Sequence, residues 1–175
     1  SIATRASFFG AYQRPQGIVA WLDYIVILGM LLQKLRTRPQ LDRLITIILL
    51  TSFPVALYGI LQHFGLDPLP WSLDFDNRSG ATLGNPIFLS AYLIMVFTLT
   101  LGKIVLEVRV ALTARHALSG ITSLIACVVI ATAQVLAIFV SDSRGPLLAV
   151  FAGGVFFLAL LALLMRRRGW VLGAL

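Results

Sequence analysis

Charge is scarce in this sequence. Only 12% of its 175 residues are Asp, Glu, Lys or Arg, about half of the ~25% found in soluble domains, whereas 59% are hydrophobic. A domain of ~150 residues buries only ~70% of the surface that its unfolded chain exposes, so a soluble fold of this size cannot hide so many apolar side chains. The composition therefore excludes a soluble globular protein, and it excludes intrinsic disorder, which requires low hydrophobicity.

Cysteine and histidine are scarce as well. The single cysteine, Cys127, can form no disulfide within the chain. The two histidines, His63 and His116, lie on opposite faces of the membrane in the topology that the charges indicate, so they cannot share a metal ion. No segment has the pattern CxxC, HExxH, GxSxG or GxxxxGK[ST]. We therefore expect no metal site.

Long apolar runs, in contrast, are abundant. Five of them have roughly the ~20 residues that a helix needs to cross a bilayer: 17–35, 41–64, 85–106, 118–140 and 146–165. They predict an all-α integral membrane protein, a polytopic bundle of about five transmembrane helices that forms a single membrane domain over residues 1–175. Because residues 170–175 look like the start of a further apolar run, we expect the chain to be part of a longer protein.

The basic residues alternate between the linkers in step with the five runs. One side receives Lys34, Arg36, Arg38, Arg43, Lys103, Arg109, Arg115, Arg166, Arg167 and Arg168, and the other receives only Arg5, Arg14, Arg78 and Arg144. Cytoplasmic loops carry the excess of Lys and Arg, so the N-terminal segment is predicted to lie outside. Residues 65–84, rich in Gly, Pro and Asp, are then an irregular loop on the outer face. The net charge of +7 thus reports topology, and we expect no nucleic-acid partner.

An arginine precedes each predicted helix that runs inward. Arg14, Arg78 and Arg144 all lie on the outer side, shortly before residues 17, 85 and 146. Helix N-termini attract anions through free N–H groups and partial positive charge, and a guanidinium matches phosphate oxygens in bidentate fashion. The pattern predicts a diphosphate site formed by these three arginines. The alternative is that each arginine extends to lipid phosphates and only fixes the depth of its helix.

Two of these helix starts carry capping residues. Asn85 followed by Pro86 is typical of an N-cap and of the first helical position. Ser143 offers a hydroxyl to the last helix, and Pro146 is expected at the first position of that helix. Asn85 and Ser143 are therefore predicted to be secondary residues of the diphosphate site.

Two ionisable residues on the outer side are further secondary candidates. Asp23 lies about two turns inside the first run, where an acid is expensive and indicates function, but it can also reach interfacial water or pair with Arg14. His63 and Gln62 end the second run. An imidazole titrates near neutrality, so His63 is a candidate proton carrier, and the simpler interpretation of both residues is a polar cap at the interface.

Polar residues in the other runs have a structural interpretation. Gln134 is expected to hydrogen-bond a neighbouring helix, as polar side chains in membrane helices commonly do. Lys103 and Glu107 are four residues apart on one helical face, and we expect them to form a solvated ion pair.

Four stretches of the sequence resemble one family. They are SFFGAYQRPQG (7–17), ALYGILQHFGLDPLPW (56–71), RSGATLGNPIFLSAYL (78–93) and SDSRGPLLAV (141–150). The third is similar to the Arg/Gly-rich, Asn-Pro opening of a span in the O-antigen ligase and polymerase superfamily of bacterial inner-membrane glycosyltransferases. The fourth is similar to the Ser-Arg-Gly turn of that superfamily. The stretches cover most of the chain in the same order and on the same side of the membrane.

The resemblance implies an activity and a location. Members transfer a glycan from an undecaprenyl-diphosphate carrier at the periplasmic face of the inner membrane to a lipid-A core, another repeat unit or a protein side chain. They need no metal or nucleotide cofactor. By this resemblance the partners are membrane lipid and lipid-linked glycan, Arg78 and Arg144 match arginines that grip the carrier diphosphate, and Arg14 matches an early arginine.

The resemblance leaves open whether this chain is an enzyme. The catalytic histidine of the family belongs to a large periplasmic loop that this sequence lacks, and neither His63 nor His116 fits its place, so no catalytic residue is assigned. Two other functions stay open. One is a non-catalytic transmembrane subunit, whose partners are other membrane subunits or the remainder of the same chain. The other is a lipid-carrier transporter, which would need ionisable residues deep in several spans, and only Asp23 comes close.

Overall fold

The described part of the chain is almost entirely helical. The computed structural model describes residues 4–9, 17–67, 78–112 and 117–172; 88% of these residues are helical and none forms a strand. The elements are α1 (Thr4–Phe9), α2 (Ile18–Lys34), α3 (Arg38–His63), the 3₁₀ helix η1 (Ala81–Leu83), α4 (Pro86–Ala111), α5 (Ala117–Val140) and α6 (Arg144–Leu172). The predicted all-α class is confirmed for these residues.

Four of the helices are long and apolar enough to cross a membrane. They are α3, α4, Leu118–Val140 of α5 and Arg144–Leu164 of α6. At 1.5 Å per residue, the 26 residues of α3 cover about 39 Å, more than the ~30 Å of a hydrocarbon core. The 17 residues of α2 cover only about 26 Å, so the fifth span remains a prediction.

Two of the observed helices are longer than the predicted runs, because the ends of those runs had been placed at charged residues. α3 and α5 agree with the prediction to within three residues, whereas α4 continues beyond residue 106 to Ala111 and α6 continues to Leu172. Lys, Arg and Glu are good helix formers, so a charged residue marks the edge of an apolar layer and not the end of a helix. Within the predicted irregular loop, residues 81–83 form η1.

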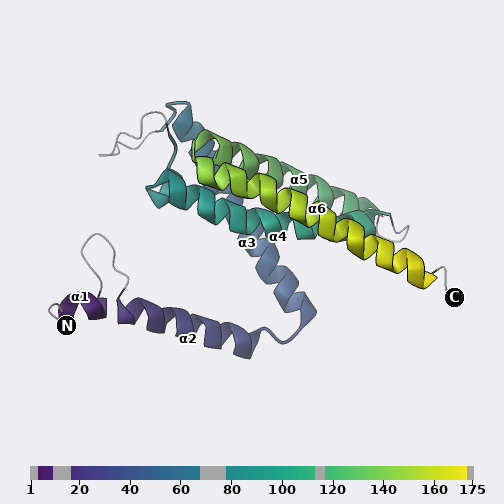
Figure 1. Ribbon diagram of the computed structural model, residues 1–175, viewed down its shortest axis with the longest axis horizontal. Helices are drawn as coiled ribbons and strands as arrows, with labels where there is room; N and C mark the ends of the chain where they lie inside the picture. The colour runs from purple at the N-terminus through teal and green to yellow at the C-terminus, as the bar shows by residue number, and fades with distance from the viewer. Residues whose placement is uncertain (1–3, 10–16, 68–77, 113–116, 173–175) are drawn as a thin grey trace. The chain divides into compact units, whose positions relative to one another are not determined.

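The chain divides into two compact units, Ser1–Ile45 and Thr46–Leu175. In the first unit, α1 contacts α2, and none of the described α2 side chains is buried. In the second unit, α4, α5 and α6 run side by side (Figure 1), and α3 and η1 complete their apolar core. The buried core residues are Ala56, Ala81, Leu89, Leu93, Ala133, Ala137 and Ile138. The single domain over residues 1–175 remains a prediction.

A buried glutamine joins three helices of the second unit. Gln134 on α5 donates from Nε2 to Ser52 Oγ of α3 (2.8 Å) and accepts at Oε1 from Thr100 Oγ1 of α4 (3.1 Å). All three side chains are fully buried. An unpaired polar group in apolar surroundings costs several kcal/mol, so this network fixes how the three helices are aligned. The expected helix–helix role of Gln134 is confirmed.

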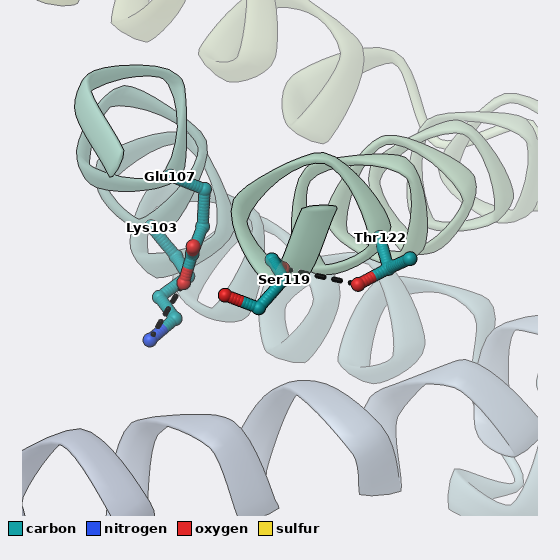
Figure 2. Close-up of polar contacts among 4 residues, drawn as sticks. All are labelled: Lys103, Glu107, Ser119 and Thr122. Atoms are coloured by element: carbon teal, nitrogen blue, oxygen red, sulfur yellow. Dashed lines mark hydrogen bonds and ion pairs between the residues drawn. The ribbon is translucent and has the colours of Figure 1, made fainter. Parts of the chain in front are cut away.

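An ion pair lies in the second half of α4. Lys103 Nζ is 3.1 Å from Glu107 Oε1, as the spacing predicts, but each side chain is only 12% exposed. Figure 2 shows the first turns of α5 beside the pair, where Ser119 points toward Glu107 and Thr122 donates a hydrogen bond to the Ser119 carbonyl (3.0 Å). The expectation of a solvated pair is therefore wrong, because it considered one helix alone and α5 shields the pair.

Replacing Glu107 alone with Gln should destabilise the chain more than replacing both charges through Lys103→Met and Glu107→Leu. The single change leaves a shielded ammonium without its carboxylate, at a cost of about 2 kcal/mol, between the ~0.5 kcal/mol of an exposed pair and the ~3–5 kcal/mol of a buried one. The double change leaves no charge behind. The free energy of unfolding in detergent, followed by circular dichroism, provides the measurement, and a negligible loss in Glu107→Gln would show that water screens the pair.

Candidate functional site

At one end of the second unit α3 ends, α4 begins and α5 turns into α6 (Figure 1). Hydrogen-bonded polar side chains lie there. We define the polar cluster as Tyr58, Gln62, Asp67, Arg78, Ser79, Ser90, Ser141 and Ser143. Its four serines are buried. Throughout the described residues, every buried side-chain nitrogen and oxygen has a hydrogen-bond partner. The hydrogen bonds of the cluster form two networks, one around Gln62 and one around Arg78, which meet at the adjacent residues Arg78 and Ser79.

Gln62, the last residue but one of α3, anchors the loop that leads to α4. Its Oε1 accepts hydrogen bonds from Ser79 Oγ (3.1 Å), Gly80 N (3.0 Å) and Ala81 N (2.8 Å). All three donors belong to buried residues, so water cannot replace the Gln62 amide oxygen as their acceptor. Gln62 thus does more than cap the interface, because it joins α3 to the segment that carries Arg78.

The amide nitrogen of Gln62 forms a hydrogen bond as well. Gln62 Nε2 donates to Asp67 Oδ2 (2.9 Å), and this carboxylate also accepts from the hydroxyl of Tyr58 one turn earlier on α3 (2.9 Å to Oδ1). A carboxylate that accepts from two donors fixes both of them, since charge-assisted hydrogen bonds are the stronger kind. Tyr58 and Asp67 therefore hold the Gln62 side chain in the orientation that the loop requires.

The loop before α4 is tightly folded. A Cβ on Gly80 would lie 2.8 Å from the backbone N of Asn85, so only glycine fits there, and Ala81 has a left-handed φ of +46°. Asn85 Oδ1 then accepts from Ile87 N (2.9 Å), and Pro86 is the first residue of α4. The N-cap predicted for Asn85 is confirmed, and it gives α4 a defined start beside the cluster.

Arg78 connects this loop to the turn between α5 and α6. Its Nε donates to the Ser141 carbonyl (3.2 Å) and its Nη2 donates to Ser143 Oγ (3.2 Å). These bonds use two of the five guanidinium N–H groups, and the other three have no acceptor among the described residues. Arg78 therefore fixes the turn with two hydrogen bonds, which also hold its own side chain in place.

Two serine hydroxyls join α4 to the same turn. Ser90 Oγ and Ser141 Oγ contact each other, and each also reaches a backbone carbonyl, Pro86 O of α4 for Ser90 (2.8 Å) and Ile138 O of α5 for Ser141 (2.7 Å). Two hydroxyls supply two protons for these three contacts, so two of the three hydrogen bonds form at any time. Together with Arg78, the serines tie residues 141–143 to α4.

The start of α6 differs from the prediction. α6 begins at Arg144, and Ser143 is its N-cap by position because the Ser143 carbonyl accepts from Leu147 N (3.2 Å). The Ser143 hydroxyl bonds to Arg78 and does not cap the helix. Pro146 is the third helical residue and not the first. Proline is accepted there because the first four N–H groups of a helix have no partner within it.

Unused donors therefore remain at the N-terminus of α6. The side chain of Arg144 is exposed and forms no hydrogen bond or ion pair with any residue that the structure describes. The backbone N–H groups of Arg144 and Gly145 likewise have no acceptor in the described ranges. The guanidinium of Arg78 bonds to Ser143, the residue directly before Arg144 in the chain. One fixed and one free guanidinium beside a helix N-terminus can hold an anion with several oxygens.

The remaining predicted residues have other surroundings. Arg14 lies outside the described residues. The half-buried ring of His63 packs edge-on against Phe64, with the ring centroids 5.4 Å apart. Asp23 lies on α2 in the first unit, with its side chain exposed. The structure thus brings Arg78, Ser143 and Arg144 together.

Sequence reasoning missed part of the polar cluster. Ser90 gave a usable signal, because a hydroxyl inside an apolar helix often faces a neighbouring helix. The contact between Tyr58 and Asp67 gave none, because the two residues are nine positions apart across the end of a helix. The roles of Ser79 and Ser141 depend on how the loop and the turn fold back, which no helical or strand period encodes.

Gln62→Leu should lower the free energy of unfolding by about 3 kcal/mol, because each buried donor left without an acceptor costs ~1–3 kcal/mol. Gln40→Leu is the matched control. Gln40, also on α3, accepts from the backbone N of Arg36 (3.0 Å) and of Thr37 (3.1 Å), but these groups are exposed and water can replace the amide. The control should lose at most about 1 kcal/mol. Equal losses in denaturant titrations of the two variants would contradict the role of Gln62.

The chain was compared with protein-family models, with curated proteins and with solved structures. No family model, no curated protein and no solved structure matches it. The interpretation of the site therefore rests on the geometry of the polar cluster, the free donors of α6 and the motifs in the sequence.

Proposed function

We propose that this chain is part of an O-antigen ligase- or polymerase-like membrane glycosyltransferase, and that it binds the diphosphate of an undecaprenyl-diphosphate-linked glycan at the periplasmic face of a bacterial inner membrane. The proposal concerns binding and not turnover. Glycosyl transfer needs a base within hydrogen-bond reach of the acceptor, and no residue of this chain is assigned that role.

One observation carries the proposal: Arg78 is held beside the N-terminus of α6, where Arg144 has no partner among the described residues. Arg78 is fixed by two hydrogen bonds of 3.2 Å each, so its unused N–H groups lose little freedom when an anion binds. Arg144 and the two open N–H groups of α6 add donors at the same helix end. A diphosphate, with two charged groups linked by one oxygen, has the charge and the number of acceptors that such a set can use.

A lipid-carrier transporter is the second candidate, and it has less support. A transporter needs ionisable groups within the membrane that can exchange partners. Within α4, Lys103 and Glu107 are already paired with each other at 3.1 Å. They lie about 26 and 32 Å from the start of α4, at the far edge of a ~30 Å hydrocarbon core. This position suits a structural ion pair.

The proposal includes a topology of five spans. α2 supplies the additional span, the N-terminal segment lies outside, and residues 65–84 form the periplasmic loop. The ten basic residues of the opposite linkers then face the cytoplasm. On this topology the polar cluster, Arg78 and Arg144 all lie on the periplasmic side, where the carrier presents its diphosphate.

Arg144→Lys should weaken the binding of undecaprenyl diphosphate by about tenfold, or ~1.4 kcal/mol, because an ammonium cannot make the bidentate contact. Stability should not change, since Arg144 has no partner among the described residues. The Kd of the purified chain in lipid nanodiscs for a fluorescent undecaprenyl diphosphate provides the measurement. Arg43→Lys, on the predicted cytoplasmic side, is the matched control and should leave the Kd unchanged.

Arg78→Lys extends the same experiment. It removes two hydrogen bonds to the turn, so it should lower the thermal stability as well as the affinity. If both lysine variants bind the lipid as tightly as the unaltered chain, the arginines do not form the site and the proposal is wrong.

Single cysteines introduced at Thr82 and Thr37 should test the topology in a Cys127→Ala background. Both positions are exposed, whereas Ser79 of the same loop is buried and unsuitable for labelling. In cells with a permeabilised outer membrane, an impermeant maleimide should label Thr82→Cys and not Thr37→Cys. Labelling of Thr37→Cys and not of Thr82→Cys would show that the topology is reversed and that Arg78 and Arg144 face the cytoplasm.

A further inference from the structure

Positive charge is concentrated where α2 is joined to α3. Residues 34–43, which we call the basic turn, contain four cations and one acid, Asp42, a net charge of +3. The cations are Lys34, Arg36, Arg38 and Arg43, and all four side chains are exposed. None of the four forms an ion pair with a residue that the structure describes. The basic turn therefore presents positive charge that this part of the chain does not neutralise.

Hydrogen bonds hold the basic turn in a defined conformation. Gln40 Oε1 accepts from the backbone N of Arg36 (3.0 Å) and of Thr37 (3.1 Å). Thr37 directly precedes α3 and Gln40 is the third residue of that helix, which is the spacing of a capping box. Arg36 Nε donates to the Gln33 carbonyl (3.0 Å), and the other four guanidinium N–H groups have no acceptor among the described residues. The cations therefore extend from a backbone whose conformation is set before any partner binds.

Exposed apolar side chains flank these cations. Leu32 near the end of α2 is 71% exposed, and Leu41 in the first turns of α3 is 48% exposed. The basic turn leads into α3, one of the helices long and apolar enough to cross a membrane. Leucine belongs in the hydrocarbon layer, whereas Lys and Arg extend from its edge to the headgroups. The basic turn thus has the composition of a segment at the surface of a membrane.

We propose that the basic turn binds the phosphate groups of anionic phospholipids in the adjoining leaflet, which is the cytoplasmic leaflet on the proposed topology. The placement of the cations favours a leaflet over one polyvalent anion. Arg38 and Arg43 are five residues apart on α3, about 7.5 Å along its axis and about 140° around it. The headgroup layer is roughly 5–8 Å thick on each side of the hydrocarbon core. Cations on different faces within one such layer contact several headgroups, whereas a single anion needs them on one face.

A fluorophore in the basic turn tests this assignment on the 175-residue chain in dodecyl maltoside micelles. A bimane at Thr37→Cys, in a Cys127→Ala background, reports lipid binding at the basic turn during titration with dioleoyl-phosphatidylglycerol or with zwitterionic dioleoyl-phosphatidylcholine. We expect the anionic lipid to bind more tightly. One Lys or Arg near an anionic membrane surface corresponds to about fivefold in affinity. Removing two charges through Arg36→Gln and Arg38→Gln should therefore raise the Kd for phosphatidylglycerol about 25-fold.

The double variant Arg36→Lys and Arg38→Lys is the matched control. It keeps both charges and loses both guanidinium forks, so its Kd for phosphatidylglycerol should stay within about twofold of the unaltered chain, because separate headgroups need charge and not a bidentate contact. Circular dichroism of both double variants establishes that each is folded. Raising the salt to 1 M should weaken binding in the unaltered chain, since the Debye length falls to ~3 Å.

Three results would overturn this assignment. An unchanged Kd in the glutamine variant would show that the cations do not bind the lipid. Equal affinity for phosphatidylcholine would show that apolar contacts alone attract lipid to the turn. A loss in the lysine variant as large as that in the glutamine variant would indicate a guanidinium site for one anion and not a leaflet. Arg78 and Arg144 are unaltered in every variant, so each result is independent of the proposed diphosphate site.

Discussion

A polar group in a hydrocarbon layer has to find its hydrogen-bond partner inside the protein, and the second unit is arranged around this constraint. Gln134 meets it in the middle of the helices by joining Ser52 to Thr100. Gln62 meets it at one end by accepting from three donors of the loop before α4. The alignment of α3, α4 and α5 satisfies both glutamines, so the same side chains that avoid unpaired groups also stabilise the packing of the helices.

Sequence patterns predicted the contacts that form within one helix or at its end. Asn85 caps the amide two residues ahead of it, and Lys103 pairs with Glu107 one turn later, because both contacts lie within the reach of local geometry. The shielding of that pair was not predictable, because it comes from α5. The same applies to Arg78, whose two partners lie 63 and 65 residues further along the chain. Contacts over such separations depend on which helices become neighbours, and no periodicity encodes that.

The candidate site shows the same division between local and long-range features. Arg78 and Arg144 have the same place in the sequence, each shortly before an apolar run, and sequence reasoning treated them as equivalent. In the structure Arg144 is itself the first residue of α6 and its side chain is exposed, whereas a folded loop with η1 separates Arg78 from α4, and Arg78 bonds to the turn between α5 and α6. The two residues therefore have different roles: Arg78 fixes the turn that leads into α6, and Arg144 is exposed at the start of that helix.

The paired hydroxyls of Ser90 and Ser141 have a consequence for how this sequence can diverge. If either serine becomes alanine, the remaining hydroxyl still has a backbone carbonyl as acceptor, so neither loss leaves a buried donor unpaired. Arg78 has no such substitute, because no other described side chain donates to both the Ser141 carbonyl and the Ser143 hydroxyl. Among descendants of this chain, we therefore expect either serine to be replaced on its own, and we expect Arg78 to be retained for its two hydrogen bonds alone.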